Sequence, residues 1–198
     1  ETEDFRLQLK GWKQALAGFH RSRAIYPTMG NHETLLEAFA DPEGRRRVFL
    51  DQWPYATDSA EAVFAQEFIN PEDGPAPADP RRPPYRENVF SFQYGPVLCI
   101  GFNNNYWWTS NRQVARYGGS PEGYLMADQL AWIERRLAAA ERDRSVKYVL
   151  LYAQEPVFPC GGHVGDAMWW KGDNRLRACT FTAAGEVEPS PLGMIEVR

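Results

Sequence analysis

The chain has 198 residues, of which 43% are apolar and 24% charged, as expected of a single globular domain with a hydrophobic core. Its net charge of -4 and its lack of a basic run argue against a nucleic-acid-binding surface, and no apolar stretch reaches the ~20 residues of a membrane span. The three cysteines form no Cys-x-x-Cys pair, so no disulfide framework is indicated, and one disulfide bridge stays open. We therefore treat residues 1–198 as one domain.

The first part of the chain predicts a helix, a strand and a loop. Five apolar residues recur at helical spacing and predict an amphipathic helix with one buried face: Phe5, Leu9, Trp12, Leu16 and Phe19. Residues 23–30 ("RAIYPTMG") predict a short strand that ends at Gly30, and residues 33–52 predict two helical pieces. Residues 71–85 are rich in proline and predict a long surface loop of the kind that is often functional or mobile.

The second part predicts three strands around a strong helix. Residues 88–95 alternate apolar and polar side chains, and residues 96–102 are continuously apolar, so together they predict a hairpin joined through Gly95 and Pro96. A helix is predicted with an apolar stripe at Met126, Leu130, Ile133, Leu137 and Ala140. Residues 146–153 predict another strand buried on both faces, and residues 179–189 suggest a second hairpin.

This alternation of strands and helices predicts an α/β fold. In such sheets the chemistry gathers at the carboxyl ends of the strands. Polar side chains follow three of the predicted strands: Asn31 and His32 follow the first, the run of asparagines from Asn103 follows the second, and Gln154 and Glu155 follow the third. We expect the functional site there.

The order of these motifs resembles a known family. A strand leading into "GNHE" is followed by "FSFQYGPVLCIGFNNN", then "DQLAWIERRLAAA", then a buried strand that ends in a polar-Glu-Pro turn. In this order and at these distances, the chain resembles the calcineurin-like metallophosphoesterases, which include the purple acid phosphatases. The resemblance covers residues 5–159.

The resemblance implies a two-sheet sandwich flanked by helices, with two divalent or trivalent metal ions (manganese, iron or zinc) at the strand ends. It implies that a metal-bound hydroxide hydrolyses a small-molecule phosphate ester. Asn31 would be a metal ligand, His32 would stabilise the phosphoryl group or protonate the leaving oxygen, and Glu33 would hold the loop. Two cations about 4 Å apart can bind a phosphate in this way, and an imidazole suits the leaving group. Gly30 would allow the backbone turn that aims these side chains.

The chain also departs from the family pattern. It has no Asp-x-His, no Gly-Asp-x-x-Asp and no Gly-His-x-His motif, because "GGHVG" at residues 161–165 lacks the second histidine. Gln154 stands where the family has a histidine, and a glutamine is a poorer ligand for a transition metal. Two interpretations of Gln154 stay open: it binds metal, or it satisfies a backbone group at the strand end.

Three histidines cannot supply a dinuclear site, so we expect the chain to be the central part of a larger catalytic domain, without the N-terminal strands and the C-terminal motif. His163, in a glycine-rich loop, could reach the site or the substrate, and Asn103 and Glu155 are expected near it. The alternative function is a non-catalytic binding module that keeps the scaffold and has lost its metals. A third hypothesis is carbohydrate binding by an exposed row of aromatic rings: Tyr106, Trp107, Trp108, Trp169 and Trp170.

Overall fold

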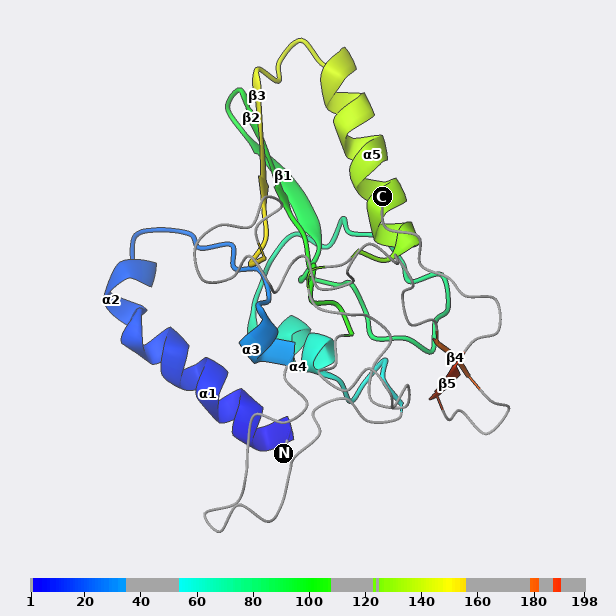
Figure 1. Ribbon diagram of the computed structural model, residues 1–198. Helices are drawn as coiled ribbons and strands as arrows, with labels where there is room; N and C mark the ends of the chain where they lie inside the picture. The colour runs from blue at the N-terminus through cyan, green and yellow to red at the C-terminus, as the bar shows by residue number, and fades with distance from the viewer. Residues whose placement is uncertain are drawn as a thin grey trace.

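A computed structural model describes residues 2–34, 54–107, 123, 125–155, 179–181 and 187–189. The described elements mix helices and strands, which confirms the α/β class (Figure 1). The helices are α1 (Thr2–Ala15), α2 (Ala17–His20), α3 (Asn31–Thr34), α4 (Ala60–Glu67) and α5 (Ala127–Arg142). The strands are β1 (Phe90–Tyr94), β2 (Val97–Gly101), β3 (Tyr148–Tyr152), β4 (Cys179–Phe181) and β5 (Val187–Pro189).

The main sheet has the strand order β1-β2-β3. β1 and β2 form the predicted hairpin, with Tyr94 opposite Val97 and the turn at Gly95, whose φ is +56°. β3 pairs with β2 in parallel, with Val97 opposite Tyr148 and Gly101 opposite Tyr152. The carboxyl ends of β2 and β3 therefore lie at the same end of the sheet. The predicted second hairpin is also confirmed, because β4 and β5 pair antiparallel.

The burial predicted for the sheet is wrong for much of it. Phe90 and Ile100 are buried, but Tyr94, at the hairpin tip, is 81% exposed. β3 was expected to be buried on both faces, and Leu150 and Leu151 are 56% and 45% exposed instead. A run of apolar residues indicates a strand, but its burial depends on what packs against it, and no described helix covers β3.

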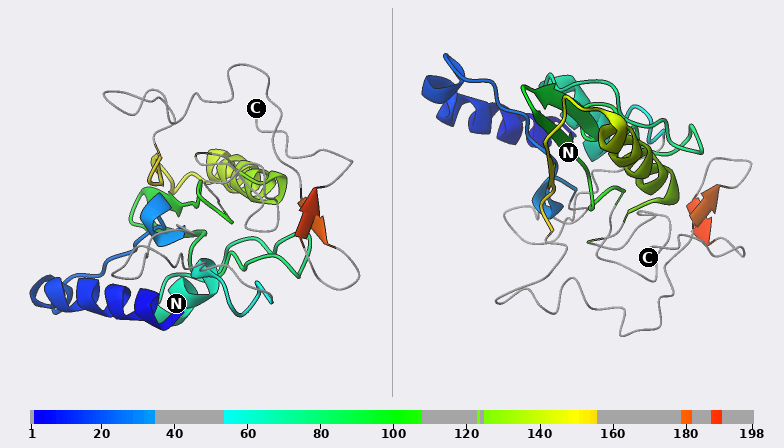
Figure 2. Two further views of the ribbon diagram at one scale, coloured as in Figure 1. Left: turned by 60° about the horizontal axis from the view of Figure 1, so that its bottom comes forward. Right: turned by 90° about the horizontal axis from the view of Figure 1, so that it is seen from above.

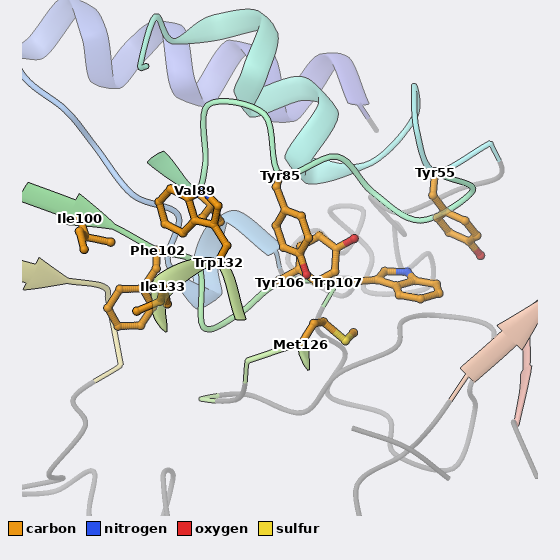
Figure 3. Packing of buried hydrophobic residues seen from close by; sticks show 10 residues of the cluster. All are labelled: Tyr55, Tyr85, Val89, Ile100, Phe102, Tyr106, Trp107, Met126, Trp132 and Ile133. Carbon is orange, nitrogen blue, oxygen red and sulfur yellow. The ribbon is translucent and has the colours of Figure 1, made fainter. Parts of the chain in front are cut away.

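The largest hydrophobic cluster forms where α5 and the segments after β2 and before β1 meet (Figure 3). Ile133 and Trp132 of α5 lie against Ile100 and Phe102, and the rings of Tyr85 and Tyr106 stack at 4.2 Å between centroids. The apolar stripe predicted for α5 is confirmed at Met126, Ile133 and Ala140, whereas Leu137 is exposed. The stripe missed Gln129 and Trp132, which are also buried.

A second cluster joins α1 to α4, which lie side by side (Figure 2). Phe5 and Leu9 of α1 are buried against Phe64 of α4 and against Phe68, the residue directly after α4. The predicted N-terminal helix is present, but its far end does not carry a buried face. Trp12 is 40% exposed, and Phe19 lies in α2 at 47% exposure.

Residues 23–30 form neither a helix nor a strand, so that prediction is wrong. The segment is held by single contacts instead of a ladder. Asn70 Nδ2 donates to the carbonyl oxygen of Pro27 at 2.9 Å, and the Tyr152 hydroxyl donates to that of Tyr26 at 3.3 Å. Pro27 has no backbone N–H, which removes one donor that a strand ladder would use.

The proline-rich loop at residues 71–85 is irregular, as predicted, and it is fastened to α5 at two points. Asp128 accepts hydrogen bonds from the Ala78 N–H at 2.7 Å, from Arg82 at 2.8 Å and from the Tyr85 hydroxyl at 2.6 Å. Asp73 pairs with Arg136 at 2.7 Å. These contacts favour a structural role for the loop.

Two further predictions about the fold are not tested by the described residues. The two helical pieces expected at residues 33–52 fall outside the described residues, apart from α3. The two-sheet sandwich stays a prediction, because the described strands form the three-stranded sheet and the β4–β5 hairpin. No helix in the described ranges is long and apolar enough to cross a membrane.

Candidate functional site

Three segments that are distant in sequence meet at the carboxyl ends of β2 and β3. The Asn31 N–H donates to Gln154 Oε1 at 3.0 Å, and Asn105 Nδ2 donates to the same oxygen at 2.8 Å. Asn31 opens α3, Asn105 follows β2, and Gln154 follows β3, and α3 lies at this end of the sheet (Figure 1). The structure therefore brings Asn31 and Gln154 together, and places Asn105 with them.

Gly30 is closely packed, so an added side chain would have to displace its neighbours. A Cβ atom at this position would lie 2.8 Å from Glu33 Oε2 and 3.0 Å from Gln154 Cγ. Its φ lies outside the left-handed region, so the predicted reason, an unusual backbone turn, is replaced by a steric one. Glu33 Oε2 accepts the Gly30 N–H at 2.8 Å, so Glu33 does hold this turn.

The run of asparagines after β2 is buried and hydrogen-bonded. Asn103 exchanges two hydrogen bonds with Gln129 of α5, at 2.8 and 2.9 Å, and its side-chain oxygen accepts the Asn105 N–H at 3.0 Å. Asn104 Nδ2 donates to the Glu155 carbonyl oxygen at 2.8 Å. Asn103 and Glu155 are thus buried next to the junction of Asn31, Asn105 and Gln154, and their hydrogen bonds hold the segments that carry it.

Of the two candidate histidines, the structure describes His32 and not His163. His32 is exposed on α3, directly after Asn31, where a small molecule at the strand ends could contact it. His163 lies outside the described residues, so its place relative to His32 stays a prediction.

The donor set of the described residues fits only part of a metal site. Amide oxygens bind hard cations, and the side-chain oxygen of Asn105 is buried without a hydrogen bond in the described part of the chain. Gln154 Oε1 already accepts two N–H groups, one of them from backbone, which corresponds to the interpretation of Gln154 as a strand-end acceptor. No group of three His, Cys, Asp or Glu side chains suited to a metal occurs among the residues described. A complete dinuclear site does not fit these residues alone.

The sequence analysis missed two residues. Asn105 could have been found, because the strand-end argument applies to the whole asparagine run. Glu61 is fully buried in α4, and its Oε1 accepts the Trp107 N–H at 2.6 Å. Burial raises the pKa of Glu61 from 4.5 to about 7, although this hydrogen bond lowers it. Its only signal in the sequence was a carboxylate directly before the apolar run at residues 62–65.

The aromatic residues after β2 are part of the core. Tyr106 is 0% and Trp107 1% exposed, so neither ring belongs to an exposed row that could stack on a sugar. Trp108, Trp169 and Trp170 lie outside the described residues.

Comparison of the chain with models of protein families, with curated proteins and with solved structures found no match.

Proposed function

We propose that this chain belongs to a metal-dependent phosphoesterase that hydrolyses a small-molecule phosphate ester. The observation that carries the proposal is the junction of Asn31, Asn105 and Gln154 at the carboxyl ends of two parallel strands. His32 is exposed beside this junction. Ligands of α/β proteins bind at this end of the sheet.

The chain's own residues would have separate tasks. Asn31 would supply a neutral oxygen ligand to one of two metal ions (manganese, iron or zinc), and the remaining ligands would have to come from residues other than those described. When bound, such metals supply positive charge for the phosphoryl oxygens and an acidified water. His32, as an imidazolium, would donate its proton to the leaving oxygen of the ester. Glu33 and Gln154 would fix the turn that carries both residues, through Gly30 and Asn31.

The test is turnover of phenyl phosphate, whose poor leaving group needs a proton, by the intact protein, supplied with manganese, iron or zinc. His32→Ala should lower kcat by about 10²-fold or more, as expected when a general acid is lost. His20→Ala is the matched control, because His20 lies in α2, packed edge-on against Trp12, and should leave kcat unchanged. Equal kcat for the wild-type protein and His32→Ala would remove His32 from the reaction.

A second candidate function is a non-catalytic relative that binds ligands on the same scaffold. The two hydrogen bonds that occupy Gln154 Oε1 favour it, because a metal at that oxygen would displace at least one of the two donors. Metal content separates the candidates. About two ions per chain would support the phosphoesterase, and none in the folded, intact protein would support the binding module.

A further inference from the structure

A cavity of ≈320 Å³ lies between α1, α4 and the segment that leads into α3. Its walls are apolar: Phe5, Leu9 and Trp12 come from α1, and Phe64 and Phe68 come from the end of α4 and just after it. This volume is at the lower end of the range for small-molecule sites, so the cavity suits a small molecule better than a polypeptide segment.

The cavity has one charged lining residue, Glu33. One of its carboxylate oxygens accepts the Gly30 N–H at 2.8 Å, and the other accepts no hydrogen bond from the described residues. Gln8 and Thr28 add the other polar side chains. An apolar chamber with a single carboxylate in its wall repels anions and offers a cation one strong partner.

The aromatic walls favour a ligand with a flat ring. Trp12 and Phe68 meet edge to face at 5.5 Å between centroids, and Phe64 and Phe68 at 4.5 Å. Aromatic faces attract both other rings and cations. Trp12 is 40% exposed in spite of these contacts, so a ligand could still cover part of its ring.

We infer that this cavity binds a small arylalkylamine, with its ring among the aromatic side chains and its ammonium group on Glu33. The inference goes beyond the phosphoesterase proposal and does not depend on it, because it requires neither metal nor turnover. It adds a second role to Glu33, which also holds the turn before Asn31.

Titration calorimetry on the intact protein tests this with three probes of one ring size. The amine 2-phenylethylamine should bind saturably. The neutral 2-phenylethanol should bind about tenfold more weakly or worse, since it loses a charge-assisted hydrogen bond, and phenylacetate should not bind. No saturable binding of the amine, or equal affinity for amine and alcohol, would overturn the inference.

Two variants localise the binding. Gln8 is exposed on α1 and lines the cavity, so Gln8→Trp should fill the entrance and abolish amine binding. Gln14→Trp is the matched control, because Gln14 is also exposed on α1 and does not line the cavity. Equal amine affinity in these two variants would place the amine elsewhere and refute the site.

Glu33→Gln tests whether the negative charge of Glu33 binds the ammonium group. This test is independent of whether the Gln8→Trp variant folds. The amide retains an oxygen for the Gly30 N–H and removes the negative charge. The amine should then bind no better than the alcohol. A variant that still prefers the amine by tenfold would show that Glu33 does not bind the ammonium group.

Discussion

The pKa of the Glu61 side chain is determined by its buried surroundings more than by its residue type. It lies in the first turn of α4, fully buried, where its carboxyl group accepts the Trp107 N–H. Its second oxygen, Oε2, is buried without a hydrogen bond among the described residues. Ionising this group in the folded state is costly, because water cannot solvate the charge. Glu61 is therefore protonated over part of the pH range in which an exposed glutamate is ionised.

The raised pKa of Glu61 leads us to expect that this residue makes the folded chain less stable as the pH rises. Its pKa is raised in the folded chain, from 4.5 to about 7, so the folded state holds a proton that the unfolded state releases. The contribution of Glu61 to the free energy of unfolding is fully present below pH 4.5. It is lost as the pH rises through 7 and amounts to at most about 3 kcal/mol. Glu61→Gln keeps the acceptor for Trp107 and cannot ionise, so this part of the pH dependence should vanish. Urea unfolding at pH 4.5, 6, 7 and 8 measures it.

The control for this prediction is Glu134→Gln, because Glu134 is exposed on α5. Its profile should run parallel to that of the wild-type chain. If Glu61→Gln also ran parallel to the wild type, Glu61 would not be the group that titrates.

At the scale of elements, the turn into α3 joins the candidate site to the sheet. Two hydrogen bonds define it: the Gly30 N–H donates to Glu33, and the Asn31 N–H donates to Gln154 after β3. A Cβ atom added at Gly30 would lie 2.8 Å from Glu33 Oε2 and 3.0 Å from Gln154 Cγ, so it would shift both acceptor side chains. The position of Asn31 and His32 therefore depends on a residue that carries no chemistry of its own.

Replacing two glycines by alanine separates this effect from helix propensity. In Gly30→Ala, the new methyl group displaces Glu33 and Gln154, so stability should fall by about 1–3 kcal/mol, the cost of both hydrogen bonds. Gly11 lies within α1, and a Cβ atom added there would meet nothing within 4 Å, so Gly11→Ala should raise stability by about 0.5–1 kcal/mol. Chemical denaturation measures both. Similar effects of the two variants would show that the turn is not tightly packed.

At the scale of the molecule, local sequence patterns predicted individual helices and strands. Contacts between distant segments and the burial of single residues depend on long-range packing, which these patterns do not predict. The β1–β2 hairpin and α5 follow from alternation, a Gly-Pro turn and helical spacing, which neighbouring residues determine. The strand-end argument found Asn31 and Gln154. It could not find the contact of Asn105 with Gln154 or the burial of Glu61, because both depend on how distant segments pack. Residues 23–30 looked like a strand, but a strand also needs a paired ladder.

The exposure of β3 gives the last prediction, which concerns how the sheet is covered. Ile100 and Leu151 are paired across β2 and β3 and lie on the same face, yet Ile100 is 0% exposed and Leu151 45%. The difference arises because Ile100 packs in the cluster with Trp132 and Ile133 of α5. Ile100→Ala should therefore cost about 2–5 kcal/mol, and Leu151→Ala less than about 1 kcal/mol.

Urea unfolding of both variants at two protein concentrations makes this comparison decisive. A small, concentration-independent cost for Leu151→Ala would mean that β3 faces solvent. A cost as large as that of Ile100→Ala would mean that something covers β3 in solution. If that cost also rose with protein concentration, a second copy of the chain would be the cover, since an exposed apolar strand at the edge of a sheet can pair with another strand.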